Sequence, residues 1–365
     1  MFNVKGNIAW AGTAAFALPI WVGTSATLVC RFLYNPVKFF RVNDRSNATF
    51  PDVMPGLKHF FIQVSGGVKL HAVSHGAGAG RPLLLFLHGF PETWHSWRHQ
   101  IAAFKDNHEI LALDMRGFGL SDAPTGIKQY SMDRLCSDVS EVIKACGHTS
   151  CMLVAHDWGG AVAWCFAANY PKMVERLSIL CSPHPAAYQD PKRFNSQQVH
   201  RSWYFLMFMA RGLPEIWMRN RDFQKIDELM LQGAWGVKRA GAITTEDIER
   251  VKAALARPGG LTGAFNYYRA SIRDQTRHPS PAVAKGVKAV LQMPVLLIHA
   301  DSDAAFCTHM FDETTKNVAN LTIVQIQECS HWANQDRPEV VNGHLKVFLS
   351  VKKGDIGGVP QDPQH

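Results

Sequence analysis

The sequence predicts an α/β protein in which a mostly parallel sheet, flanked by helices, carries an all-helical insertion. Two observations lead to this fold class. Short apolar runs alternate with helical patterns over most of the 365 residues, and this alternation stops between residues 183 and 293. Alternating strands and helices imply crossover connections and a parallel sheet. A helical stretch of about 100 residues is too long for a loop.

The strands are predicted first. Residues 60–64 and 68–73 flank Ser65-Gly66-Gly67, which is typical of a β-hairpin. Continuous apolar runs are expected of strands that are buried on both faces. They occur at residues 83–87, 110–114, 152–156, 176–181, 295–299 and 321–326. Helical patterns between and after them cover residues 132–146, 160–170 and 338–351.

The predicted domain organisation follows from these patterns. In the insertion, helices are expected at residues 201–211, 222–231, 245–256 and 262–272, and together they should cover the carboxyl edge of the sheet, where open α/β proteins place their sites. The expected segments are an N-terminal membrane anchor (1–30), a linker (31–58), the first part of the core (59–185), a helical lid (186–290), the second part of the core (291–352) and a tail (353–365).

The predicted anchor is an apolar N-terminal segment. Residues 6–30 contain no charge, and as a helix they would reach about 37 Å, enough to cross a hydrocarbon core of about 30 Å. A cleaved signal peptide is disfavoured because its apolar region is normally shorter, about 7–15 residues. A buried globular helix is the remaining alternative. We therefore expect a single-pass transmembrane helix.

Charge and cysteine usage exclude several classes of protein. The net charge is +8, but the basic residues are scattered rather than gathered into the stripe of a nucleic-acid binder, so no nucleic-acid partner is expected. The eight cysteines show no CxxC pattern or short regular spacing. Neither a metal site nor a disulfide framework is predicted, and a reducing compartment is favoured.

A catalytic nucleophile is predicted where the strand at 152–156 ends. There the sequence reads Ala155-His156-Asp157-Trp158-Gly159-Gly160, so an apolar strand runs through a small-residue turn into a helix. This is the setting of a nucleophile elbow. The central residue is Asp157, and no G-x-S-x-G occurs, which disfavours a serine esterase. A carboxylate nucleophile forms an ester that water must then cleave.

Two further strand ends supply the groups that this second step needs. His331 follows the last predicted strand and is the candidate base, and Asp303 follows the strand at 295–299 and is the candidate acid that orients it. Taken singly, an Asp or His in a loop is usually a cap or a solvated residue. Together, however, they occur along the chain as nucleophile (Asp157), acid (Asp303) and base (His331). This is the chain order of the α/β-hydrolases. An oxyanion hole is predicted from the backbone N–H groups of Phe90 and Trp158.

Four motifs carry a resemblance to a known family. They are His88-Gly89-Phe90-Pro91-Glu92, Asp114-Met115-Arg116-Gly117-Phe118-Gly119, His156-Asp157-Trp158-Gly159-Gly160 and Cys329-Ser330-His331-Trp332. Over roughly residues 58–352 the chain resembles the epoxide hydrolases of the α/β-hydrolase superfamily. It is most similar to the membrane-anchored animal members that lack a phosphatase domain.

The resemblance implies further site residues. Two lid tyrosines polarise and protonate the epoxide oxygen in this family, and Tyr204 and Tyr268 fall at the matching positions. Tyr267 is an adjacent competitor for Tyr268, and the run that follows Tyr204 departs from the family pattern. Phe90, Pro91 and Trp158 are the implied substrate contacts. A core-packing role for each tyrosine is the alternative, since a buried Tyr needs only a partner for its hydroxyl.

The function implied is conversion of a lipophilic epoxide and water to a vicinal diol, without a metal or an organic cofactor. A dehalogenase of the same fold would use the same Asp and His but would hold a halide with Trp or Arg side chains. A lipid-binding α/β-hydrolase that has lost turnover is the second alternative. Neither the physiological epoxide nor the oligomeric state follows from the sequence.

Membrane topology is predicted from the charges that flank the anchor. Arg31, Lys38, Arg41 and Arg45 lie on its C-terminal side, whereas Lys5 is the only basic side chain before it. The positive-inside bias places the C-terminal side in the cytosol. We expect the catalytic domain on the cytosolic face of an internal membrane, the endoplasmic reticulum. Two glycosylation sequons, at Asn47 and Asn320, favour the opposite orientation.

Overall fold

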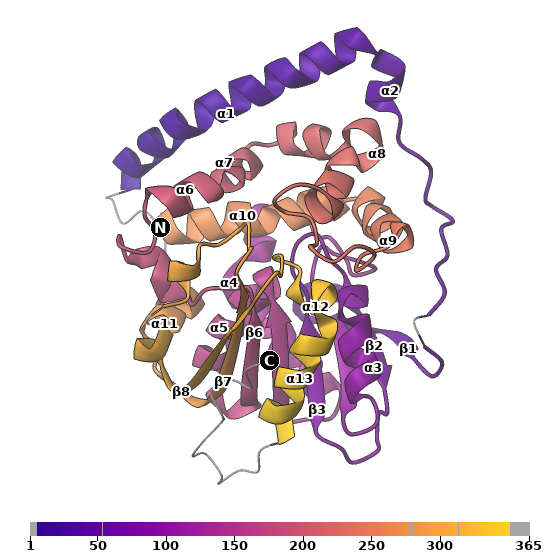
Figure 1. Ribbon diagram of the computed structural model, residues 1–365, viewed down its shortest axis with the longest axis vertical. Helices are drawn as coiled ribbons and strands as arrows, with labels where there is room; N and C mark the ends of the chain where they lie inside the picture. Colours follow the sequence, from indigo (N-terminus) through magenta and orange to yellow (C-terminus); the bar gives the residue numbers. More distant parts are fainter. Residues whose placement is uncertain (1–5, 53, 277–279, 313, 351–365) are drawn as a thin grey trace.

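A single eight-stranded sheet forms the centre of the molecule (Figure 1). The computed structural model describes residues 6–52, 54–276, 280–312 and 314–350. The strand order is β1-β2-β4-β3-β5-β6-β7-β8. The strands are β1 (Lys58–Val64), β2 (Val68–His75), β3 (Leu83–Leu87), β4 (Glu109–Leu113), β5 (Cys151–His156), β6 (Val174–Leu180), β7 (Leu291–Ala300) and β8 (Val318–Ile326).

The pairing of the strands confirms the predicted sheet. β2 is antiparallel to both β1 and β4, and every pair from β4 to β8 is parallel. Every residue of β3 and β4 is buried. Apart from Glu109 at the start of β4, these strands read as continuous apolar runs, because helices cover both faces of the sheet.

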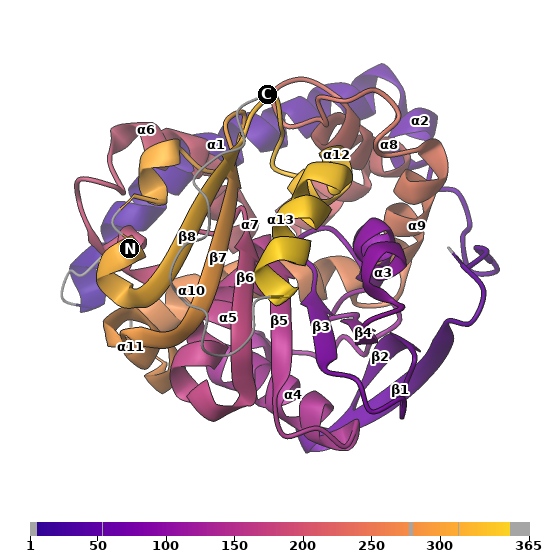
Figure 2. The same cartoon turned by 60° about the horizontal axis from the view of Figure 1, so that its bottom comes forward.

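Two helical layers provide that cover (Figure 2). One face packs against α3 (Arg98–Phe104), α12 (Ala333–Asp336) and α13 (Pro338–Ser350), and the other against α4 (Met132–Ala145), α5 (Asp157–Asn169) and α11 (Pro281–Lys288). Short 3-10 helices lie at Ser65–Gly67, Trp94–Trp97, Ile127–Tyr130, Pro171–Met173, Pro185–Gln189, Thr308–Met310 and Thr314–Asn317.

A helical lid lies over the edge of the sheet where the parallel strands end (Figure 1). It consists of α6 (Ser196–Arg201), α7 (Trp203–Met209), α8 (Leu213–Leu231), α9 (Thr245–Ala256) and α10 (Gly260–Thr276). The helix expected at 201–211 corresponds to α7, except that Arg201 ends α6 and Ser202 separates the two helices. The expected lid also includes α11, which packs on α4 and α5 instead. Its Gly286 allows this approach, because a Cβ there would lie 2.9 Å from Cys165 Sγ.

The N-terminal segment is more helical than expected. α1 (Gly6–Tyr34) and α2 (Pro36–Phe40) extend into the expected linker. Within the described residues, the window Ala17–Tyr34 is long and apolar enough to cross a membrane. In Figure 1, α1 lies across the outside of the lid. The predicted tail, residues 353–365, lies outside the described residues.

Candidate active site

Asp157 stands at a strained turn between β5 and α5. Its φ is +47°, a backbone conformation that non-glycine residues rarely adopt. Small neighbours make this turn possible: a Cβ on Gly159 would lie 2.3 Å from the Leu87 carbonyl oxygen, and one on Gly89 would lie 2.5 Å from Asp157 Cβ. The loop after β3 and the start of α5 therefore meet at the Asp157 side chain, as the elbow motif predicts.

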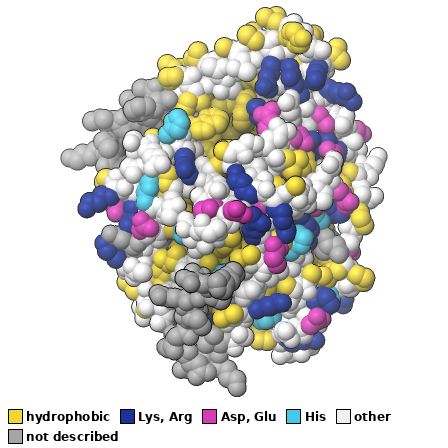
Figure 3. Space-filling model, in the orientation of Figure 1, with side chains coloured by type: hydrophobic (Ala, Val, Ile, Leu, Met, Phe, Trp, Pro, Cys, Tyr) yellow, Lys and Arg dark blue, Asp and Glu magenta, His cyan; other side chains and the backbone are white. Residues whose placement is uncertain are grey.

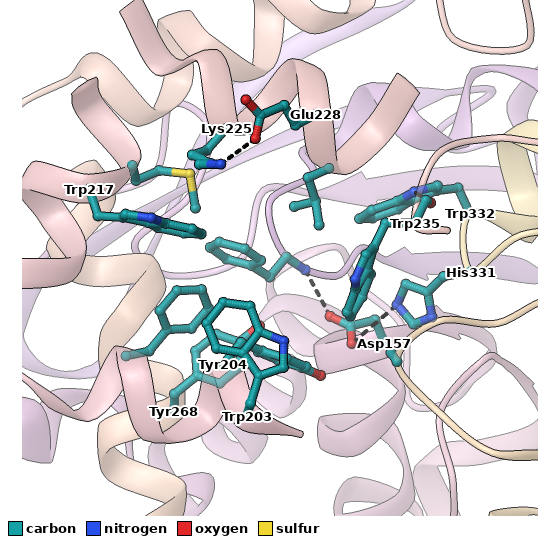
Figure 4. Close-up of a pocket in the computed structure, with 15 residues that line it drawn as sticks. Asp157, Trp203, Tyr204, Trp217, Lys225, Glu228, Trp235, Tyr268, His331 and Trp332 are labelled. Carbon is teal, nitrogen blue, oxygen red and sulfur yellow. Dashed lines mark hydrogen bonds and ion pairs between the residues drawn. The ribbon is translucent and has the colours of Figure 1, made fainter. Parts of the chain in front are cut away.

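The structure brings the three residues of the predicted triad together, and Figure 4 shows Asp157 and His331 facing each other. His331 Nε2 lies 3.5 Å from Asp157 Oδ2, and His331 Nδ1 lies 2.9 Å from Asp303 Oδ2. Both His331 and Asp303 are buried. The three side chains come from the ends of β5, β7 and β8, which the parallel sheet carries to one edge. This is the geometry of a nucleophile, a base and an orienting acid.

Electrostatics fix the charge states of this group. Burial disfavours a charged His331, but the negative charges of Asp303 and Asp157 outweigh that effect and raise the pKa of His331 to about 10. Burial disfavours a charged Asp157 too, yet its contact with His331 holds the pKa of the Asp157 carboxyl below its usual value. At neutral pH the resting site thus contains a carboxylate facing an imidazolium.

One of the two amides of the predicted oxyanion hole contacts the other oxygen of Asp157. The backbone N–H of Phe90 donates to Asp157 Oδ1 at 2.9 Å. Trp158 is the second residue of α5, and the first amides of a helix have no partner within the helix. Oδ1 is therefore held by a backbone amide beside a helix N-terminus, while Oδ2 faces His331.

An apolar cavity of about 200 Å³ lies over Asp157 and His331. Tyr204 and Tyr268 both line it, and their rings pack edge to face with centroids 5.9 Å apart. Tyr267 points elsewhere: its hydroxyl donates to the Arg116 carbonyl oxygen at 2.8 Å. The structure thus places Tyr268, rather than its neighbour, in the cavity over Asp157.

The two tyrosine hydroxyls keep their protons at neutral pH. Burial raises the pKa of Tyr204 well above its usual value, and the neighbouring Tyr268 and Asp157 add to the shift. Burial and the charge of Asp157 likewise raise the pKa of Tyr268. Both side chains are consequently available as proton donors.

The predicted substrate contacts separate into two groups. Phe90 lines the cavity. Pro91 follows Phe90 through a cis peptide bond and is buried in the adjoining turn. Trp158 packs edge to face on Tyr268, with ring centroids 4.9 Å apart, and lines a second cavity behind it. Pro91 and Trp158 are not among the described residues that line the cavity over Asp157.

A buried network behind His331 was not predicted. His156 Nδ1 bonds to Glu92 Oε2 at 2.7 Å, and its Nε2 bonds to the backbone oxygen of His331 at 2.9 Å. Gln335 donates to the other Glu92 oxygen at 2.8 Å. Glu92 and His156 occur in the sequence motifs, but the motifs do not indicate that the two side chains are in contact. The network holds the backbone of the predicted base.

The lid holds the loop that carries Asp303, which was also not predicted. Gln198 on α6 is fully buried; it donates to the Ala305 carbonyl oxygen at 2.9 Å and accepts from the Cys307 N–H at 2.8 Å. Arg201 donates to the backbone oxygens of Asp303 and Phe306. The contact spans about 100 residues of chain, so local sequence patterns carry no signal for it.

One group near the site has the composition of a metal site. Ligand atoms of His156, Cys181 and His331 lie within 4.8 Å of one another. Both ring nitrogens of His156 already have hydrogen-bond partners, and Nδ1 of His331 bonds to Asp303. Burial also raises the pKa of the Cys181 thiol well above its usual value. The three residues therefore do not offer a set of free ligand atoms.

The fold and the strand-end triad define an α/β-hydrolase. Residues 82–211 match the family described as the alpha/beta hydrolase fold. The chain is 35% identical to Epoxide hydrolase 4 of Mus musculus, over 86% of each chain. It is 33% identical to Epoxide hydrolase 1 of Caenorhabditis elegans, over 90% of this chain and 79% of that one.

Solved structures agree with these relatives. The crystal structure of the Bacillus megaterium epoxide hydrolase in complex with an inhibitor superimposes with a TM-score of 0.71 at 32% identity. It covers 80% of this chain, and all of that chain is matched. The chain belongs to the epoxide hydrolases, and the protein is an epoxide hydrolase enzyme.

Proposed function

We propose that this enzyme opens epoxides through a covalent ester on Asp157. The observation that carries the proposal is the pair of distinct environments around the Asp157 carboxylate: Oδ1 accepts the Phe90 N–H, and Oδ2 faces His331. The Asp157 side chain lines the cavity. Oδ2 is then the attacking atom, and Oδ1 becomes the carbonyl oxygen of the ester. A nucleophile and a base in hydrogen-bond reach are what such catalysis requires.

In the first step, Asp157 Oδ2 forms a bond to a ring carbon while the bond from that carbon to the epoxide oxygen breaks. Tyr204 and Tyr268 donate hydrogen bonds to the leaving oxygen, and one of them supplies its proton. Asp157 loses its negative charge as the ester forms. The attraction that held the proton on His331 weakens, so the imidazolium releases that proton and the tyrosine is restored.

In the second step, the neutral His331 takes a proton from water, and the resulting hydroxide adds to Asp157 Cγ. Negative charge develops on Oδ1, where the N–H groups of Phe90 and Trp158 stabilise it. The bond between Cγ and Oδ2 then breaks, the proton of the added hydroxyl passes to the departing alkoxide, and the diol leaves with Oδ2 as one of its oxygens. Asp157 is a carboxylate again and His331 an imidazolium, so the site returns to its resting state.

Lipophilic epoxides are the proposed substrates. Apart from the catalytic side chains and the Lys225–Glu228 ion pair at its far side, the cavity is lined by aromatic and aliphatic groups such as Phe208, Met218 and Leu229 (Figure 4). Fatty-acid epoxides and arene or alkene oxides fit this lining. A turnover screen across both classes tests the proposal, with halide release from a haloalkane measured in parallel. Halide release without diol formation would identify a dehalogenase instead.

Tyr204→Phe and Tyr268→Phe are each expected to lower the rate of ring opening, by roughly a hundredfold, and the double variant should be nearly inactive. The reason is that an alkoxide leaving group needs a proton donor. Single-turnover ester formation on styrene oxide measures the effect. Tyr267→Phe is the matched control. If Tyr267→Phe strongly slows ring opening while Tyr268→Phe does not, the proton donor is Tyr267 and not Tyr268.

We also propose that the N-terminal helix attaches the enzyme to the membrane of the endoplasmic reticulum, with the catalytic domain in the cytosol. The basic residues that follow the helix support this side of the membrane, because the cytosolic leaflet carries the anionic lipids that attract them. The eight cysteines, all free in the structure, are in keeping with a reducing compartment.

Protease treatment of sealed microsomes tests this placement. The catalytic domain should be digested without detergent, because a cytosolic domain lies outside the sealed vesicle. A lumenal protein digested only after detergent is added serves as the control for membrane integrity. A catalytic domain that survives until detergent is added, or that carries glycan at Asn47, would contradict the cytosolic placement.

A further inference from the structure

α1 is packed along the lid rather than standing free of it. It contacts α7, α8 and α10. The indole N–H of Trp21 donates to the Leu206 carbonyl oxygen at 2.9 Å, and Ala17 and Leu28 are buried in the same contact region. One face of the apolar helix is therefore already covered by protein over several turns.

The end of α1 and the segment after it are bound to the lid by polar contacts. Arg31 donates to the Asn220 side-chain oxygen at 3.2 Å, and the Asn220 amide donates to the Phe39 carbonyl oxygen at 3.1 Å. The Asp222 N–H donates to the Arg41 carbonyl oxygen at 2.8 Å. These bonds link the end of α1 and the C-terminal end of α2 to α8.

The lid adopts a strained backbone at this contact. Arg221, Asp222 and Phe223 all have positive φ, between +53° and +60°, which interrupts α8. Each such residue costs about 1–2 kcal/mol. Arg45 binds both oxygens of Asp222, at 2.6 and 2.9 Å, and also pairs with Glu249. The N-terminal segment thus stabilises a lid conformation that is unfavourable by itself.

The opposite face of the helix is apolar and uncovered. It is formed by Leu18, Val22, Val29 and Leu33 of α1 and continues through Val37 and Phe40 of α2, which we call the outer face. Spacings of four and eleven residues place the α1 members on one side of the helix. Their side chains are 55–73% exposed, and those of Val37 and Phe40 are 81% and 69% exposed.

We propose that α1 and α2 lie in the plane of a bilayer surface, with the outer face in lipid and the lid directly beneath them. If the docked α1 crossed the bilayer, the lid helices packed along it would enter the hydrocarbon too. α8 carries Arg219, Arg221, Asp222 and Lys225, and charges at that depth are expensive. The in-plane arrangement keeps these charges at or below the interface and still buries the outer face.

Charge favours an anionic bilayer as the partner. Lys38 and Arg41 are exposed beside the outer face, and Arg219 is exposed next to the Asn220 contact. Figure 3 shows Lys and Arg side chains grouped just below the apolar edge of the molecule, toward the end where α2 lies. Basic groups at the rim of an apolar face bind anionic headgroups while the face itself enters the acyl region.

The same arrangement places the cavity near the membrane. Trp203 on α7 and Trp217 on α8 line the cavity, and both helices contact α1. Lipophilic molecules dissolved in the bilayer would then have a short path to Asp157. This consequence rests on the proposed function, whereas the in-plane placement does not.

Accessibility of the N-terminus distinguishes the in-plane from the spanning arrangement. The full chain with an N-terminal epitope tag is expressed in microsomes, which are then sealed and treated with protease. If the tag and the catalytic domain are both digested, they lie together on the outer, cytosolic side, and the in-plane helix is supported. If both are protected, the in-plane helix is still supported, but the proposed cytosolic placement is contradicted. A tag and a domain on opposite sides of the membrane would overturn the inference.

Vesicle binding tests the outer face itself. The double variant Val22→Asp, Leu33→Asp should bind vesicles of phosphatidylcholine with phosphatidylserine roughly tenfold more weakly than the unchanged protein. Val347→Asp, at an exposed apolar position on α13, is the matched control and should bind as before. Lys38→Glu with Arg41→Glu should weaken binding only where phosphatidylserine is present. The proposal would be refuted if the outer-face variant bound vesicles as strongly as the unchanged protein. It would also be refuted if the unchanged protein formed a soluble dimer that does not bind vesicles.

Turnover links the surface to the site. The Val22→Asp, Leu33→Asp variant should keep its activity on water-soluble styrene oxide and lose activity on an epoxide confined to vesicles. Equal loss on both substrates would mean that the substitutions disturb the fold, and a thermal unfolding midpoint identifies that case. Inactivity of the unchanged protein on every epoxide would contradict the proposed function but leave the binding experiments intact.

Discussion

Asp157→Ala is expected to abolish diol formation, with a loss of several orders of magnitude in turnover. The carboxylate is the only group placed to attack the epoxide carbon in the proposed mechanism, and its oxygens are held by the Phe90 N–H on one side and face His331 on the other. Without it no ester forms, and the remaining groups can only bind the substrate. Diol production from styrene oxide, followed by chromatography, measures the effect.

The control for this variant is Asp106→Ala, which removes an exposed carboxyl far from the elbow and should leave turnover unchanged. Asp157 lies at a positive-φ turn rather than in the apolar core, so the variant should still fold, and circular dichroism checks that it does. Residual diol formation above about one per cent of the unchanged enzyme would contradict the covalent mechanism, because losing a nucleophile costs far more than that.

The sequence predicts the sheet and the placement of Asp157, Asp303 and His331 because those signals are local. Each residue follows a buried strand, and parallel strands end at one edge of the sheet. Gly159 is likewise readable from sequence, since only a residue without a side chain allows the approach of the Leu87 carbonyl that the structure contains.

The lid is less predictable because its residues act through long-range contacts. Whether Tyr267 or Tyr268 lines the cavity over Asp157 depends on how α10 packs. In the structure Tyr268 lines it, whereas the Tyr267 hydroxyl donates to the Arg116 carbonyl oxygen. Gln198 contacts the Asp303 loop more than 100 positions away. Its sequence neighbourhood contains no pattern that marks it.

The N-terminal helix shows a different limit of what the sequence can predict. Hydropathy and length identify a segment able to enter a membrane, but they do not tell whether one side of it is already occupied. That information lies in Trp21, whose indole bonds to the lid, and in the polar contacts of Arg31 and Arg45. An apolar segment can thus satisfy the criteria for a span and still have one face packed on its own domain.

His331→Gln is expected to stop turnover after the first step, so that the ester on Asp157 accumulates. His331 is the only base within reach of Asp157 among the described residues, and the ester carbonyl becomes unreactive to water without one. Glutamine keeps a polar side chain of similar size but does not take up a proton at neutral pH. Intact-protein mass after incubation with an excess of epoxide should rise by the mass of one substrate molecule.

Two companion variants make the mass measurement specific. Asp157→Ala combined with His331→Gln should show no increase, because the residue that carries the ester is missing. His309→Gln, which changes a partly buried histidine hydrogen-bonded to the Arg193 carbonyl oxygen, should keep turnover and show no accumulated ester. Substrate consumption by His331→Gln without any mass increase would assign that histidine to ring opening rather than to ester hydrolysis. An increase that survives loss of Asp157 would place the covalent bond on another residue and overturn the assignment of the nucleophile.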